Sequence, residues 1–227
     1  MRPTETNLLA TMSSSPARPG VTFRRGARAT LVLLALAASV GPWRGTAHEM
    51  HEMAGMDSGD DEAPPSRSMR EYAVPDVRLV RDDGKVVSLA QEMDDGRPIF
   101  LNFIFTTCTD ICPLMSSVFE QFQQRLGEEA GKVHLMSISI DPEQDTPARL
   151  SEYARKFHAG REWQHYTGTR EASIAAQRAF DVYRGGKMRH TAVTLVRVAP
   201  GKPWLRIEGF VKPDDLVHDY RHMLAAR

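Results

Sequence analysis

Apolar side chains recur with the period of a strand or of a helix from about residue 72 to residue 224. Val77–Val80 and Lys85–Leu89 flank Asp82-Asp83-Gly84, and an Asp-Gly pair suits the tight turn of a β-hairpin. The mostly apolar run Pro98–Phe105 is typical of a strand that is buried on both faces. We therefore predict a hairpin at the start of the folded region, followed by a central strand.

The next segment has the spacing of a helix. Apolar residues recur every four positions from Leu114 to Leu126, and Gly127 is a typical stop signal. The other predicted elements are a strand at Val133–Ile140, a helix opened by Thr146-Pro147 and running to about His158, a short strand, a helix at Glu171–Phe180, an antiparallel pair at Ala192–Val198 and Trp204–Gly209, and a helix at Asp214–Leu224. Two β-α units followed by a hairpin and a terminal helix form a thioredoxin-like arrangement. We expect residues 72–227 to be one α/β domain with a thioredoxin-like fold, a mixed central sheet and flanking helices.

The first 47 residues carry the pattern of an export signal. Arginines at positions 24, 25 and 28 precede the apolar stretch Leu31–Val40, and small residues follow up to Ala47. An apolar run of about ten residues is short for a spanning helix, which needs roughly 20 residues. We expect residues 1–47 to be a signal peptide or an uncleaved membrane anchor, and the domain to work in the periplasm or another extracytoplasmic space.

Residues 48–71 are expected to form a flexible linker, since they offer few bulky side chains to bury. The linker begins His- and Met-rich and then turns acidic. Histidines and methionines crowd into its first nine residues, namely His48, Met50, His51, Met53 and Met56. Imidazole suits copper of either valence and thioether sulfur favours Cu(I). This tail either collects copper or is a solvated segment of accidental composition.

Charge and cysteine content exclude several classes of protein. The 227 residues carry 29 basic and 29 acidic side chains, so no overall basic field is present to hold nucleic acid. The balance conceals an asymmetry, because six arginines against one glutamate give residues 1–47 a charge of +5, leaving −5 for the remainder. Two cysteines are too few for a disulfide-stapled miniprotein or a four-thiolate zinc site.

Both cysteines lie where the predicted central strand meets the next helix, in Cys108-Thr-Asp-Ile-Cys112-Pro113. A helix N-terminus favours the thiolate, and Pro113 is tolerated in a first helical turn. If the segment is helical, the four-residue spacing lets the two sulfurs reach one another or one metal ion. The motif alone also permits a structural disulfide or two inert thiols.

Three landmarks together resemble the Sco/SenC family of thioredoxin-fold, copper-binding assembly factors for the binuclear copper site of cytochrome c oxidase. They are the Cys108–Pro113 motif, Asp141-Pro-Glu-Gln-Asp-Thr-Pro147 and a lone His190 before a strand. The resemblance implies that Cys108, Cys112 and His190 bind one copper ion, Cu(I) or Cu(II). This sequence departs from the family pattern at one point: Met188-Arg189 precede His190, whereas in the family aspartate usually precedes the histidine.

Three functions follow as hypotheses. The first is a copper metallochaperone that delivers copper to the oxidase site or prepares it. Its partner would be the copper-site subunit of cytochrome c oxidase or another periplasmic copper chaperone. The second is a thiol–disulfide oxidoreductase that reduces partner cysteines with Cys108 and Cys112 and does not need His190. The third is a peroxidase, since Thr106-Thr107-Cys108 resembles thiol-peroxidase loops. Whether the protein is an enzyme stays open between them.

Overall fold

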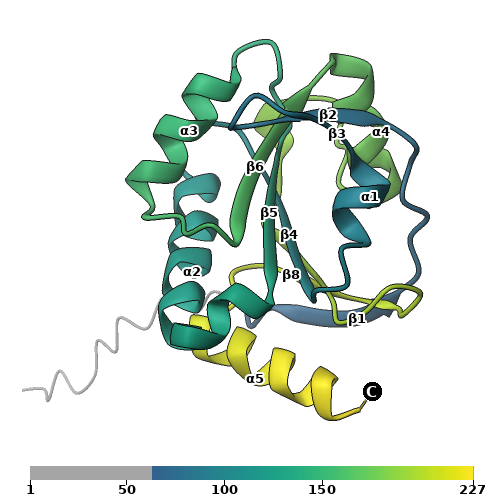
Figure 1. The fold of residues 1–227 in the computed structure, drawn as a ribbon, viewed down its shortest axis with the longest axis vertical. Coiled ribbons are helices and arrows are strands. Elements are labelled where there is room, and N and C mark those ends of the chain that lie inside the picture. The colour runs from purple at the N-terminus through teal and green to yellow at the C-terminus, as the bar shows by residue number, and fades with distance from the viewer. Residues whose placement is uncertain (1–62, 227) are drawn as a thin grey trace, which may run out of the picture. The chain divides into compact units, whose positions relative to one another are not determined.

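The computed structural model describes residues 63–226, whose strands form a mixed sheet in the order β1-β8-β7-β4-β5-β6-β2-β3 (Figure 1). The strands are β1 (Ser66–Arg70), β2 (Arg78–Arg81), β3 (Val86–Ser88), β4 (Ile99–Ile104), β5 (His134–Ser139), β6 (Trp163–Gly168), β7 (Val193–Arg197) and β8 (Trp204–Glu208). β4 pairs with β5 and β5 with β6 in parallel, whereas the other neighbours are antiparallel. The predicted mixed sheet is confirmed, with β4 and β5 at its centre.

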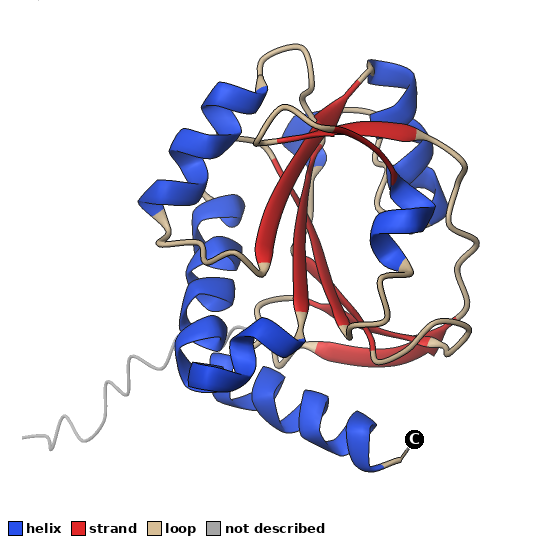
Figure 2. Ribbon diagram, viewed as in Figure 1, coloured by secondary structure: helices blue, strands red, loops and turns tan. Residues whose placement is uncertain are grey.

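Helices cover both faces of the sheet (Figure 2). They are α1 (Leu89–Met93), α2 (Ile111–Leu126), α3 (Pro147–Lys156), α4 (Arg170–Ala179) and α5 (Pro213–Ala225), with 3₁₀ turns η1 (Gly127–Lys132) and η2 (Lys187–Arg189). Alternate β4 side chains enter two different cores. Phe100 and Ile104 join the core beneath α2, α3 and α5, whereas Leu101 and Phe103 join the core beneath α1 and α4. All six residues of β4 are buried, as the apolar run predicted.

The helix boundaries follow local chemistry. α2 ends at Gly127, whose φ of 54° is unfavourable for residues with a side chain. α3 begins after Thr146, whose hydroxyl accepts a hydrogen bond from the Arg149 N–H at 3.3 Å. Pro147 occupies the first turn, where no helical partner for an N–H is lost. The predicted start of this helix at Thr146-Pro147 is therefore confirmed.

The folded region begins earlier than the sequence indicated. Residues 66–70 were expected to belong to a flexible linker, but they form the edge strand β1, paired along its length with β8 from Ser66 opposite Glu208 to Arg70 opposite Trp204. Four of its five residues are exposed, Met69 among them. Main-chain pairing rather than apolar burial holds this strand, so it leaves no alternating pattern in the sequence.

The export signal expected over residues 1–47 and the tail at residues 48–56 lie outside the described residues. Between residues 63 and 226, no helix combines the length and the apolar composition needed to cross a membrane.

Candidate metal centre

The two cysteines lie in one tight loop at the end of β4. The chain leaves the strand at Phe105, turns at Thr106-Thr107, and enters α2 one residue before Cys112. The Cys108 N–H donates to the Phe105 carbonyl at 3.1 Å, and the Cys112 N–H donates to Cys108 Sγ at 3.4 Å. The Phe105 N–H donates to Cys112 Sγ at 3.4 Å, so both sulfurs are held by backbone N–H groups. Both cysteines are free thiols.

The two thiols differ in burial and therefore in reactivity. Cys112 is fully buried in the α2 core, whereas Cys108 is partly exposed. Burial raises the pKa of the Cys112 thiol far above its ordinary value, the N–H of Phe105 opposes this shift, and a hydrogen bond with the Cys108 side chain adds to it. Burial of Cys112 therefore opposes the thiolate that a position at a helix N-terminus favours.

A buried carboxylate that the sequence analysis did not single out orders this loop. Asp145 is fully buried and accepts hydrogen bonds from the Thr106 N–H at 3.2 Å, the Thr106 hydroxyl at 2.5 Å and the Ser139 hydroxyl at 2.6 Å. It thereby ties the cysteine loop after β4 to the end of β5. In the sequence Asp145 is one of several acids in a loop, and only the fold reveals that its partners converge.

His190 lies at the end of η2, just before β7, and only 8% of its surface is exposed. Its side chain is hydrogen-bonded to the backbone of Phe103, while its Nε2 is buried without a hydrogen-bond partner. Burial lowers the pKa of His190, and the nearby charge of Arg184 lowers it further. A neutral imidazole with one nitrogen oriented by a carbonyl and the other free is the state in which histidine binds metals.

Contacts between side chains bring the three landmarks to the same end of the sheet. Lys187 Nζ lies 2.5 Å from Asp141 Oδ2 and 5.4 Å from the centre of the Phe105 ring. Lys187 precedes His190, Asp141 follows β5, and Phe105 contacts the sulfur of Cys112. Yet within residues 63–226 no three His, Cys, Asp or Glu side chains form a ready metal site. The structure brings Cys108 and Cys112 together in one loop, and His190 lies at the same end of the sheet without forming a group of ligands with them.

A model of the SCO1/SenC family matches residues 66–225, which include the cysteine loop, the Asp141 loop and His190. This chain belongs to the SCO1/SenC family. The matched region begins at the first residue of β1, in agreement with the edge strand that the sequence analysis missed. The fold of this Sco/SenC protein is thioredoxin-like, as predicted.

Known relatives resemble this Sco/SenC chain over its folded part. A SCO1 protein homolog of Bacillus subtilis is 35% identical over 104 residues, which are 45% of this chain and 53% of that relative. The copper-bound crystal structure of Arabidopsis thaliana ScoI is 27% identical with a TM-score of 0.56, covering 66% of this chain and 96% of that one. The chain spans about half or less of the length of the curated relatives it matches.

A second solved structure concerns BsSco, described as a member of the Sco family of cytochrome c oxidase assembly proteins in which a disulfide switch was identified. It is 27% identical with a TM-score of 0.58, and the match covers 68% of this chain and 95% of BsSco.

The remaining candidate residues of this Sco/SenC protein fall outside the centre. Met188, at the position where the sequence departs from the family pattern, is 83% exposed. Arg189 places one guanidinium nitrogen 2.7 Å from the position a Cβ would take at Gly185, whose φ of 81° favours glycine. His165 lies fully buried in β6.

Proposed function

We propose that this protein is a copper metallochaperone that delivers copper to, or prepares, the binuclear copper site of cytochrome c oxidase. Membership of the SCO1/SenC family supports this proposal, as do the copper-bound ScoI structure and the description of BsSco as an oxidase assembly protein. The observation that carries it is the buried, unpartnered Nε2 of His190, at the same end of the sheet as two free cysteines whose loop joins the Cys112 N–H to Cys108 Sγ. A buried polar nitrogen without a hydrogen-bond partner destabilises the folded state unless a ligand binds it.

The proposed donors are Cys108, Cys112 and His190. Thiolates favour Cu(I), and imidazole helps to accommodate Cu(II). Because Cys112 is held as a neutral thiol, copper binding must release its proton, which couples affinity to pH. Because the three donors are not preassembled, we expect the metal to bind first to the two sulfurs and the imidazole to close upon it. Three donors leave an open side from which a partner extracts the ion.

A copper titration of the reduced chain tests these ligands. Cu(II) should produce a sulfur-to-copper charge-transfer band that is lost in Cys108→Ala and in Cys112→Ala. His190→Ala should weaken Cu(II) more than Cu(I), since two thiolates alone hold Cu(I). His158→Ala is the matched control, because this exposed imidazole pairs with Glu120 instead. An unchanged Cu(II) spectrum in His190→Ala would refute the ligand assignment.

A thiol–disulfide oxidoreductase is a second candidate, and the arrangement of the two thiols favours it. Partly exposed Cys108 would attack a partner disulfide, and buried Cys112, already in hydrogen-bond contact, would resolve the mixed disulfide. The partner gains two electrons and two protons as these thiols become a disulfide. Cys112→Ser should then trap the partner covalently through Cys108. Retained reduction of the partner in His190→Ala would favour this role over copper delivery.

Partner and location belong to the same proposal. The partner is the copper-site subunit of cytochrome c oxidase or another periplasmic copper chaperone, and residues 1–47 export the domain or tether it to the inner membrane.

The His- and Met-rich residues 48–56 would then collect copper close to the membrane. Removing residues 48–56 should slow copper loading at low copper without changing the stoichiometry at Cys108 and Cys112. Equal loading rates would reduce this segment to a spacer.

A further inference from the structure

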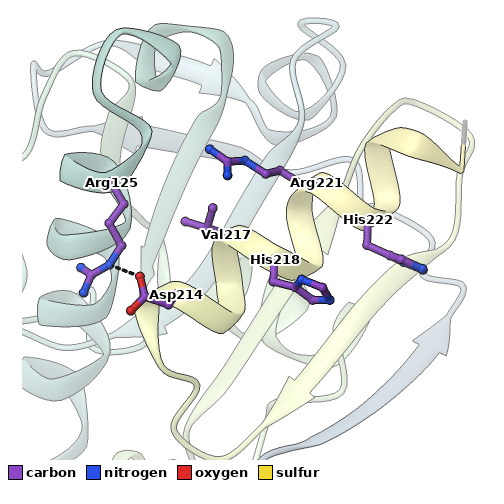
Figure 3. A pocket seen from close by; sticks show the side chains of 6 residues that line it. All are labelled: Arg125, Asp214, Val217, His218, Arg221 and His222. Carbon is purple, nitrogen blue, oxygen red and sulfur yellow. Dashed lines mark hydrogen bonds and ion pairs between the residues drawn. The ribbon is translucent and has the colours of Figure 1, made fainter.

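We propose that His218 and His222 on α5 form a second metal site, which binds a divalent first-row transition ion and prefers Cu(II). The two histidines are four residues apart on one helix and both are exposed. They flank a hollow of about 520 Å³ between α2 and α5, which Arg125, Asp214, Val217 and Arg221 also line (Figure 3). This site is independent of the proposed copper-chaperone function.

The geometry of the two rings suits a shared ion. Their centroids are 6.4 Å apart and their planes differ by 23°. Two imidazoles that hold one ion with bonds of about 2.0–2.1 Å have centroids at most roughly 6 Å apart, and closer when they bind at right angles. Both side chains are exposed, so small rotations of χ angles bring the nitrogens to one ion without moving the helix.

Both imidazoles are also available for binding. No side-chain hydrogen bond or ion pair of His218 or His222 occurs within residues 63–226, where the two rings stack on each other. Water would fill the remaining coordination positions of a two-histidine site. Imidazole suits zinc, copper and nickel, and affinity for such a site rises to a maximum at Cu(II) in the divalent series. The helical spacing is the one by which paired histidines bind zinc on a helix face.

The charges around the hollow do not block a cation. The acid that lines the hollow, Asp214, forms an ion pair with Arg125 at 2.5 Å, so this pair carries no net charge. Arg221 opposes a cation, but in Figure 3 its side chain extends away from α5 on the side opposite the two imidazoles. A water-exposed, two-ligand site beside an arginine is suited to an ion that exchanges readily, in contrast to the buried sulfur site.

The second site is separate from the thiols. Arg125, at its edge, lies near the end of α2, whereas Cys112 lies in the first turn of that helix. Thirteen residues of helix separate them, or about 20 Å at 1.5 Å per residue. One ion therefore cannot contact both sets of ligands, and a copper count on the intact chain should exceed one per molecule even without the His48–Met56 tail.

Nuclear magnetic resonance of the histidine ring protons in the full chain tests the site residue by residue. Once one equivalent of Cu(I), which is diamagnetic, occupies Cys108 and Cys112, substoichiometric Cu(II), a paramagnetic ion, should broaden the ring signals of His218 and His222 together, before that of His158. His158 is the matched control, a single exposed imidazole with a carboxylate neighbour. In His218→Ala, the copper concentration needed to broaden His222 should rise by about 100-fold, because chelation by two linked ligands is lost. His222→Ala should do the same to His218.

Two results would overturn the proposal. Broadening of His222 at an unchanged copper concentration in His218→Ala would show that the rings bind independently. Broadening of His158 together with the pair would show general binding to surface imidazoles. Neither result depends on Cys108, Cys112 or His190, so failure here leaves the proposed function untouched. Both substituted residues are exposed, and circular dichroism of each variant verifies that α5 remains folded.

Discussion

Cys108 and Cys112 share a loop but not an environment, and their difference in burial determines their chemistry. The thiolate is the reactive form of cysteine. Because burial holds the pKa of Cys112 far above the ordinary range, this residue stays a thiol at neutral pH. Cys108 is partly exposed and receives a hydrogen bond from the Cys112 N–H. Access from solvent therefore favours Cys108 as the first residue to react.

Alkylation of the reduced, metal-free protein at neutral pH should accordingly modify Cys108 first and leave Cys112 largely protected. Peptide mass spectrometry over a time course with iodoacetamide measures the two rates. In denaturant both residues should react at similar rates, which is the control for intrinsic reactivity. Equal rates in the folded protein would contradict the burial of Cys112.

The buried histidine His165 should make the protein sensitive to acid. Burial lowers its pKa to about 3, whereas in the unfolded chain an imidazole titrates near 6.5. Between these values the unfolded state binds a proton that the native state does not, so stability is highest above pH 6.5 and falls as the pH drops towards 3. From pH 6.5 to 4.5 the loss attributable to this group is about 2–3 kcal/mol.

Replacing His165 with Phe should remove that part of the pH dependence, because the ring would still stack on Trp163, whose centroid lies 5.1 Å away. Urea unfolding of both proteins from pH 7 to pH 4 measures the difference in slope. His158→Gln, at an exposed site, should unfold with the slope of the unsubstituted chain. If His165→Phe kept the full acid sensitivity, the neutral state assigned to His165 would be wrong.

At the scale of elements, one ion pair connects the loop after β5 to the turn that carries His190. Lys187 lies 2.5 Å from Asp141 and covers the Phe105 ring. The Lys187 side chain is 37% exposed, so the pair should contribute no more than about 1 kcal/mol to stability. Its role is to position η2 relative to the cysteine loop.

Lys187→Met keeps most of the side-chain length over Phe105 and removes the charge. If His190 is a copper ligand as proposed, the Cu(II) affinity of Lys187→Met should fall severalfold, since His190 is less well placed in this variant. Its Cu(I) affinity should stay unchanged. Competition titrations with chelators measure both affinities, and Lys202→Met, at the exposed turn between β7 and β8, is the control. A rise in Cu(II) affinity would mean that charge repulsion by Lys187 outweighs positioning.

Elements that bury a periodic apolar face were the ones the sequence predicted correctly. β4 and α2 are examples, since burial on both faces or on one stripe leaves a period in the residues themselves. The sequence of β1, Ser-Arg-Ser-Met-Arg, shows no apolar period, because main-chain pairing with β8 holds this strand. The short helix α1 was missed because its first residue, Leu89, ends the strand-like run that begins at Lys85, and five residues are too few to show a helical period.

The site was predictable only as far as its chemistry is local. Spacing alone suggested that Cys108 and Cys112 touch, and family resemblance singled out His190. The organising role of Asp145 could not be predicted, because its partner Thr106 lies in the turn after β4, its partner Ser139 ends β5, and the two meet only in the folded molecule. The same holds for the burial that keeps Cys112 neutral, which depends on packing rather than on its position in a helix.

For the whole molecule, β1 determines where the independent folding unit begins. It covers β8, which would otherwise become an edge strand carrying the buried side chains of Leu205 and Ile207. Arg67 adds an ion pair to Asp219 of α5 at 2.9 Å. Exposed edge strands recruit other chains through their unpaired N–H and C=O groups. The loss of β1 should therefore affect association as well as stability.

A chain that starts at Tyr72 should consequently be less stable than one that starts at Ala63, by roughly 1–3 kcal/mol, since lost hydrogen bonds are partly offset by the entropy of five released residues. It should also self-associate as its concentration rises. Urea unfolding and light scattering on both chains measure the two effects. In the longer chain, Ser68→Pro should reproduce a milder form of both, because proline removes one strand N–H opposite Arg206. Equal stability and a monomeric short chain would show that β1 is dispensable and that the domain begins with the β2–β3 hairpin.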